Sequence, residues 1–389
     1  MRPVNPNMAA TQAPPVMQAR RWLDGVTFSP DRPLINVSQA APVAPPPAPL
    51  RRAIADAALN EADAHLYGPV LGLPELRAEV GAHWSAAYGG TIGTHEVAIT
   101  SGCNQAFAAA IATLAAPGDQ IILPTPWYFN HKMALDMAAI GCVALETGRD
   151  LLPDPDRATA LITDKTRAIV LVTPNNPGGV EYPAALVRAF YDLARRHGLA
   201  LILDETYRDF HSQTGAPHDL FADPDWPDTL IQLYSFSKAY RLTGHRVGAM
   251  VAGSKRLTEV EKYLDTVTIC PNQLGQRAAL WGMQNLGDWL AGERLEILRR
   301  RDAMVAGFPR LDGWTLLAAG AYFAYAEHPF DENATDLARR MVTEAAVLAL
   351  PGPMFMPDSG DQGRHQMRFA FANIDSAGIS TLFDRLAAL

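Results

Sequence analysis

Five short β-rich segments, several of them apolar at nearly every position, occupy the middle of the chain. They are QIILP from residue 120, AIVLVTP from 168, LALILDE from 199, TLIQLYS from 229 and VGAMVAG from 247. Strands of this kind bury both faces, which is typical of a mostly parallel sheet built from βαβ units. Helical periodicity fills the gaps at 104–115, 131–139, 183–197 and 254–264. The sequence therefore predicts an α/β fold.

The pattern changes after about residue 277. A long helical stretch from Gln276 to Val305 comes first, followed by GWTLL, AYFAYAE, a helix near 335–345, and the strand MRFAFA with a terminal helix. This arrangement indicates a smaller α+β domain. We assign 46–277 to a large domain, whose mostly parallel, mixed sheet is flanked by helices, and 278–389 to the small C-terminal domain.

Residues 1–45 form an N-terminal arm, which we expect to pack on the small domain. The prolines at positions 3, 6, 14 and 15 exclude a continuous helix there. The segment PVAPPPAPL, residues 42–50, is predicted to be an extended, stiff connector.

Charge and cysteine usage exclude several classes of partner. The net charge is −8 and the longest basic run is Arg299–Arg301, so nothing predicts binding to nucleic acid. The three cysteines are far apart and lack zinc-site spacing, which indicates no metal site, no disulfide framework and a reducing, cytoplasmic location. No apolar run reaches the length of a membrane span, and we expect no membrane partner.

Polar residues cluster just after the predicted strands, where ligands bind in open parallel sheets. They are Asp204 and Tyr207 after LALILD, Asn176 after AIVLVTP, Lys238 and Arg246 after TLIQLYS, and Gly102, Cys103 and Asn104 at a helix start after EVAIT. Backbone NH groups at a helix start favour an anion. These residues therefore define a candidate binding site at one edge of the sheet.

Each of these residues alone has an ordinary structural explanation: Lys238 is a solvated loop lysine, Arg246 a surface ion-pair partner, Asp204 a cap and Asn176 part of a turn. Together they match one ligand. An arginine and a helix start suit a phosphate monoester, a carboxylate suits a protonated ring nitrogen, and a desolvated lysine suits an aldehyde. The combination describes pyridoxal 5'-phosphate.

The segment SFSKAYRLTGHRVG resembles the signature S-x-S-K-x-x-x-x-x-G-x-R-x-G of fold type I pyridoxal-phosphate enzymes, specifically the class I/II aminotransferases. The resemblance extends from LINVSQAAP to MRFAFANID. It implies that Lys238 is the catalytic lysine that carries the cofactor as a Schiff base. It also implies that Ser235 and Arg246 hold the phosphate, with Ser237 as a further candidate.

Three other segments resemble cofactor-binding elements of the same family. TPNNPGG implies that Asn176 donates to the phenolic oxygen of the cofactor, and that it lies close to the substrate. LDETYRDF implies that Asp204 pairs with the pyridinium nitrogen and that Tyr207 also bonds the phenolic oxygen. TSGCNQA implies that the backbone at Gly102, Cys103 and Asn104 cradles the phosphate.

Two aromatic residues are assigned through the resemblance. Trp127 in PTPWYFNH is predicted to stack on the cofactor ring, with its neighbour Tyr128 as a rival and an ordinary core aromatic as the alternative. Tyr67 in YGPVLGLPELR is predicted to cross a dimer interface to the phosphate in the partner chain, which implies a homodimer with shared active sites. The alternative for Tyr67 is a tyrosine packed within its own chain.

Substrate binding is assigned to Ala40, Asn176 and Arg368. Arg368 in QMRFAFANID would bind the α-carboxylate, and its alternative is a structural ion pair. Ala40 in SQAAP replaces the glycine usual in the family, where backbone approaches that carboxylate.

The choice of amino donor depends on the charges near its side chain. Asn104 is neutral where some aspartate-specific relatives carry lysine, which favours neutral or aromatic amino donors. Three further residues were not placed by the sequence and are alternative sources of positive charge: Arg241, His245 and Arg364.

The resemblance implies an aminotransferase that moves an amino group from an L-amino acid to a 2-oxo acid by a ping-pong mechanism. A β-lyase, a decarboxylase or an acyl-transferring synthase on the same scaffold shares Lys238, Asp204 and Arg246. A non-catalytic protein that binds pyridoxal phosphate is the alternative from a different class.

Overall fold

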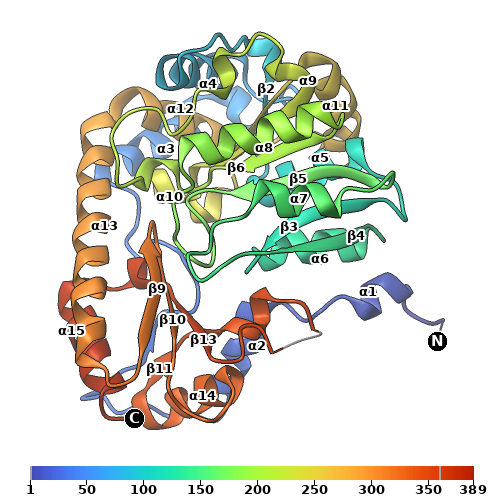
Figure 1. The fold of residues 1–389 in the computed structure, drawn as a ribbon. Helices are drawn as coiled ribbons and strands as arrows, with labels where there is room; N and C mark the ends of the chain where they lie inside the picture. The colour runs from blue at the N-terminus through green and yellow to red at the C-terminus, as the bar shows by residue number, and fades with distance from the viewer. Residues whose placement is uncertain (1, 359–360) are drawn as a thin grey trace.

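A computed structural model describes residues 2–358 and 361–389 of the chain. Its larger sheet has seven strands in the order β2-β8-β7-β6-β5-β3-β4 (Figure 1). In that order their bounds are Val97–Thr100, Gly248–Ala252, Leu230–Ser235, Ala200–Asp204, Thr166–Val172, Gln120–Thr125 and Gly141–Glu146. β8 runs antiparallel to both of its neighbours, and the other pairs are parallel. The prediction of a mostly parallel, mixed sheet is confirmed.

Helices cover both faces of this sheet because successive strand residues point to opposite sides. In β5, Ile169 and Leu171 belong to the core beneath α4 (Pro74–Tyr88) and α8 (Ala184–Arg196). Ala168 and Val170 belong to the opposite core, beneath α5 (Cys103–Leu114), α6 (Phe129–Met137) and α11 (Ser254–Thr268). Shorter helices are α7 (Pro155–Leu161), α9 (Trp226–Thr229) and α10 (Phe236–Ala239).

A second, smaller sheet is antiparallel, with the order β12-β13-β10-β9. Its strands span Leu350–Pro351, Gln366–Phe369, Phe323–Glu327 and Thr315–Gly320, and α14 (Ala334–Arg340) and α15 (Ser376–Leu386) belong to the same part of the chain. A short parallel pair joins β1 (Ile35–Asn36) to β11 (Val347–Leu348). Most of these elements contribute to one hydrophobic core, as expected for a smaller α+β unit, and Tyr207 and Phe210 from the region after β6 join that core.

The predicted long helix is two helices. α12 (Gln273–Asn285) ends before Leu286, and α13 (Gly287–Gly307) begins after it. The break falls between an asparagine and a glycine, both of which are weak helix formers. α13 runs along the side of the molecule from the large sheet to the small one (Figure 1).

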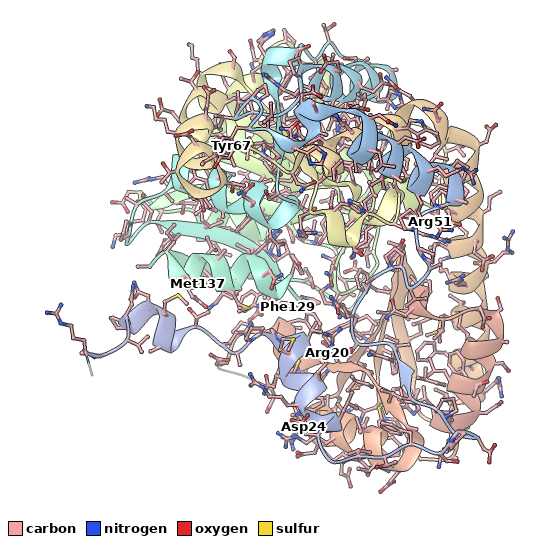
Figure 2. The ribbon with its side chains drawn as sticks, turned by 180° about the vertical axis from the view of Figure 1, so that it is seen from behind. Arg20, Asp24, Arg51, Tyr67, Phe129 and Met137 are labelled. Atoms are coloured by element: carbon pink, nitrogen blue, oxygen red, sulfur yellow. The ribbon has the colours of Figure 1, made fainter. Side chains whose placement is uncertain are left out.

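The N-terminal segment contains two short helices, α1 (Pro6–Ala10) and α2 (Pro15–Arg20). Both begin at prolines, which fit a first helical position because the missing NH has no helical partner there. Ala19 of α2 packs with residues of the smaller unit such as Leu350, while α1 lies against α6 (Figure 2). The extended connector predicted for 42–50 is wrong at its end, since α3 (Ala48–Asn60) begins at Ala48.

The division into an arm and two domains, with a boundary at residue 277, stays a prediction. Within the described ranges, none of the helices is both long enough and apolar enough to cross a membrane.

Candidate active site

A cavity of about 480 Å³ lies at the carboxyl edge of the large sheet, between that sheet, α2 and the small sheet. Most of the predicted site residues line it: Ala40, Cys103, Asn104, Asn176, Asp204, Tyr207, Ser235, Lys238, Arg246 and Arg368. Their side chains converge because β5, β6 and β7 are neighbouring parallel strands, so their carboxyl ends meet at one edge.

Asp204 ends β6 and is buried. Its Oδ1 accepts a hydrogen bond of 3.0 Å from the backbone NH of Thr206, and its Oδ2 lies 3.3 Å from His131 Nε2. Burial alone would raise the pKa of Asp204, but His131 and Thr206 hold that pKa below its usual value. The site therefore contains a buried carboxylate that stays anionic, as a protonated ring nitrogen requires.

His131 was missed from the sequence. It lies in the first turn of α6, stacks on Phe107 with ring centroids 4.0 Å apart, and approaches Asp204 from that side. The sequence does show that His131 follows the predicted strand β3 by a few residues. In the sheet only β5 lies between β3 and β6, which brings His131 near Asp204, but the order of the strands cannot be read from the sequence alone.

Lys238 lies in the short helix α10, directly after β7. Its Nζ donates a hydrogen bond of 2.5 Å to the carbonyl oxygen of Ala40. Burial, with added repulsion from Arg246 and Arg368, lowers the pKa of Lys238 from 10.5 to about 8. A larger fraction of uncharged amine is thus present at neutral pH than for an ordinary lysine, and only this form attacks an aldehyde.

A set of anion-binding groups lies beside Lys238. Arg246 Nη1 donates to Ser237 Oγ at 3.2 Å, and the NH of Ser237 donates to Ser235 Oγ at 3.3 Å. Gly102, at a φ of +86°, precedes α5, in which the NH groups of Cys103 and Asn104 come too early to have a helical partner. A Cβ at Gly102 would overlap the Arg246 guanidinium, so a side chain here would push that guanidinium out of its place in the cradle. The donors fit a phosphate monoester.

Arg368 lies on β13 and is buried. Its Nη1 donates to Asn176 Oδ1 at 2.9 Å, and Nη2 donates to the carbonyl of Ser38. Burial lowers the pKa of Arg368 to about 10, so the guanidinium is charged at neutral pH. Among the residues described, it makes no salt bridge to a carboxylate, which argues against the structural ion pair and suits a carboxylate ligand.

Of the two rival aromatic residues, Tyr128 lines the cavity and Trp127 does not, which favours Tyr128 as the residue that stacks on the cofactor. Trp127 is buried in the core formed by α5, α6 and the sheet. The Tyr128 hydroxyl accepts a hydrogen bond of 2.9 Å from Asn130 and lies 3.3 Å from Asn104 Oδ1. The two side chains are adjacent outside any regular strand, so no periodicity predicted which one faces the ligand.

Two tyrosines occupy opposite environments. Tyr207 is buried at the cavity, with its ring edge-on to Phe323 at 5.2 Å. Tyr67 is 80% exposed on the outer surface and is not part of the cavity lining (Figure 2). It is therefore not packed within its own chain, and its predicted role across a dimer interface stays a prediction.

The fold and the site together define a pyridoxal-phosphate-dependent enzyme with an aspartate-aminotransferase-like architecture. The chain belongs to the family "Aminotransferase class I and II", whose model matches residues 32–386, and enzymes of this family use pyridoxal phosphate.

Known relatives agree with this assignment. An aspartate aminotransferase of Sulfolobus acidocaldarius is 26% identical over 336 residues, which cover 81% of each chain. An aromatic aminotransferase of Arabidopsis thaliana is 28% identical over 74% of this chain and 73% of its own length. The structure of an aspartate aminotransferase from Thermus thermophilus with maleate has a similar fold, with a TM-score of 0.90 at 23% identity over both whole chains.

Proposed function

We propose that this aminotransferase takes the amino group from a neutral or aromatic L-amino acid and transfers it to a 2-oxo acid by a ping-pong mechanism. The observation that carries the proposal is the position of Lys238, whose amine lies in one cavity with Asp204, Arg246 and Arg368. In this proposal Lys238 is the nucleophile and Asp204 is the partner of the ring nitrogen. Arg246 then belongs to the phosphate site and Arg368 to the carboxylate site.

The residues divide the work by their chemistry. Bound pyridoxal phosphate supplies an electron sink for the charge left on Cα. Asp204, Tyr207 and the cradle at Gly102 would hold it. Arg368 and Asn176 bind the substrate α-carboxylate, which orients Cα toward Lys238. Lys238 Nζ then takes the Cα proton, because its lowered pKa leaves it partly uncharged at neutral pH.

The preference for neutral or aromatic donors is supported by the part of the lining that comes from the N-terminal segment and α6. Apolar side chains lie there beside the exposed Arg20: Pro14, Val16, Met17 and Phe129. Of the cations left open by the sequence, Arg241 is paired with Glu293, and Arg364 lies 3.7 Å from Asp361. Neither lines the cavity, and His245 does not line it either. The aromatic aminotransferase among the relatives supports the same preference.

A homodimer and a cytoplasmic location belong to the same proposal. Leu66 and Tyr67 are 64% and 80% exposed, an apolar pair that a second copy would cover. Mixing a Tyr67→Ala variant with a Lys238→Ala variant tests sharing, because hybrid dimers would regain one intact site and part of the activity. The three cysteines are free thiols, which suits a reducing compartment.

A single-turnover experiment tests the reaction. The enzyme loaded with pyridoxal phosphate is mixed with one amino donor and no acceptor, and the products are analysed. Stoichiometric 2-oxo acid and pyridoxamine phosphate would support the proposal. Release of pyruvate with ammonia would indicate a β-lyase, release of carbon dioxide a decarboxylase, and absence of any product a non-catalytic binding protein.

A further inference from the structure

We propose that Gln105, in the first turn of α5, is a positioning residue for the phosphate cradle formed by Gly102, Arg246 and the start of that helix. The inference rests on the assignment of the cofactor phosphate to this cradle, and it goes beyond that assignment. Gln105 lies outside the cavity lining and acts through the backbone of Ser101.

The first support is the fate of the backbone NH groups at the start of α5. The NH of Ser101 donates to Gln105 Oε1 at 2.6 Å, and the NH of Gly102 donates to the carbonyl two residues earlier at 2.8 Å. Within the described chain, the NH groups of Cys103 and Asn104 have no acceptor. Such groups need a partner, so these two are the backbone donors that remain for a phosphate.

The second support is that the contact between Gln105 and Ser101 corresponds to one half of a capping box. In that motif, a Glu or Gln at the third helical position accepts from a backbone NH just before the helix, and the N-cap side chain accepts from the first turn. The N-cap here is Gly102, which has no side chain to complete the motif. A phosphate oxygen can take the place of the missing side-chain oxygen. Gln105 therefore closes its half of the motif and leaves the other half to the anion.

The third support is that the backbone of Ser101 is held on both sides. Gln105 accepts from its NH, and its carbonyl accepts a long hydrogen bond of 3.5 Å from Arg246 Nη2. A shift of Ser101 would move Gly102, the next residue, and would change the contact with the guanidinium. Gln105 thus bears on both the NH donors and the cation of the cradle.

The fourth support is an anchor at the other end of the Gln105 amide. Its Nε2 donates to Oγ1 of Thr268, the last residue of α11. Because a backbone NH can only donate, the amide oxygen must face Ser101 and the nitrogen must face Thr268. The position of α11 is fixed by side chains buried in the core that it shares with α5: Leu257, Val260 and Leu264. The amide is therefore fastened to a rigid helix and keeps its oxygen directed at Ser101.

The test compares pyridoxal phosphate with pyridoxal, which lacks the phosphate. Equilibrium dialysis of the cofactor-free protein gives Kd for each ligand in the wild type, Gln105→Leu and Gln120→Leu. Gln120 is the matched control, because its Oε1 accepts from Thr163 Oγ1 at 2.9 Å at the amino end of β3, whereas the cavity lies at the carboxyl edge of the sheet. We expect Gln105→Leu to raise Kd about fivefold to twentyfold for pyridoxal phosphate and less than about twofold for pyridoxal. Gln120→Leu should change neither.

A second pair of variants keeps Gln105 and changes only its anchor, so it stays informative if Gln105→Leu does not fold. Thr268→Val removes the hydroxyl and should raise Kd for pyridoxal phosphate about twofold to threefold. Thr268→Ser keeps the hydroxyl and should bind like the wild type. Kd for pyridoxal should stay the same in both.

Two results would count against the inference in different ways. If Gln105→Leu weakened the two ligands by the same factor, or weakened neither, Gln105 would have no role in the cradle, although the cradle itself would stand. If the wild type bound pyridoxal as tightly as pyridoxal phosphate, the assignment of the cradle would fail, and the inference with it. Neither measurement depends on amino transfer, so the single-turnover experiment tests the proposed function separately.

Discussion

His131 and Asp204 form a buried pair in which Nε2 lies 3.3 Å from Oδ2, with side chains only 2% and 4% exposed. The imidazole is held by stacking on Phe107, so its position is fixed by the core and not by the carboxylate. An imidazole placed in this way keeps a buried carboxylate anionic at the end of β6. The residue that tunes the cofactor partner thus comes from a helix more than 70 positions earlier in the chain.

Replacing His131 with phenylalanine should weaken cofactor binding. The ring stack on Phe107 is kept, but Asp204 loses a partner, so burial raises its pKa. We expect Kd for pyridoxal phosphate to rise about tenfold at neutral pH and further as pH falls toward about 5, because Asp204 then protonates at a higher pH than in the wild type. Equilibrium dialysis across this pH range measures the effect.

The control is His83→Phe, because His83 is 48% exposed and pairs with Glu79 on the surface. That variant should bind the cofactor like the wild type at every pH. If the Kd of His131→Phe exceeded that of the wild type by the same factor at every pH, the role assigned to the imidazole would be contradicted.

Gly102→Ala should weaken cofactor binding through a steric effect. The added Cβ meets the Arg246 guanidinium, and it also strains a residue at a φ of +86°. Gly118→Ala separates the two causes, since Gly118 has a φ of +93° and open space around its Cβ position. Each variant should lose about 1–2 kcal/mol of unfolding free energy, measured with urea. Only Gly102→Ala should bind pyridoxal phosphate more weakly, by about tenfold or more. If the two variants bound pyridoxal phosphate with equal affinity, Gly102 would have no role in keeping the phosphate site open.

The sequence predicted those cavity residues that directly follow a strand. Parallel strands bring their carboxyl ends to one edge of the sheet whatever the order of the strands. Asp204, Asn176 and Lys238 are of this kind. His131 needed the strand order β6-β5-β3, which depends on helix packing and not on local pattern. The path of the N-terminal segment along the cavity was not predicted either, because its prolines were interpreted as breaks although two of them begin helices.

The sequence also did not predict which distant segments pair as strands. β1 joins β11 across more than 300 positions through only two residues each, too short for a periodic signal. The break at Leu286 is similar, since α12 and α13 together present one helical pattern. The local sequence predicts the existence of an element better than where it ends.

Tyr128→Leu and Trp127→Leu should have opposite effects. Tyr128 lines the cavity, so losing its ring should raise Kd for pyridoxal phosphate about tenfold and shift the visible absorbance of the bound cofactor, with unfolding free energy nearly unchanged. Trp127 is 5% exposed in the core, so its truncation should cost about 3 kcal/mol of stability. Urea unfolding and cofactor titration on both variants check this. A spectral shift in Trp127→Leu alone would restore the original assignment.

The lowered pKa of Lys238 predicts how cofactor attachment depends on pH. The rate should rise with pH up to about 8, where the amine becomes mostly uncharged, and then level off, whereas an ordinary lysine would still gain up to about pH 10. Pyridoxal is a better probe here than pyridoxal phosphate. It has no phosphate to neutralise Arg246, whose positive charge helps to lower the pKa of Lys238. Attachment is trapped with borohydride and located by mass spectrometry, with the exposed Lys255 as the internal comparison.

The same shift has a consequence for the stability of the cofactor-free protein. The pKa of Lys238 is lower in the folded chain than in the unfolded chain, so the unfolded chain binds more protons between about pH 8 and 10.5. Unfolding free energy should therefore rise with pH through this window, relative to a Lys238→Met variant that has no charge to bury. Urea unfolding of both proteins at about pH 7.5 and 10 measures the difference. A wild-type protein that gained no stability over the variant would mean that the amine is charged in the fold, and that it needs another group to remove its proton before reacting.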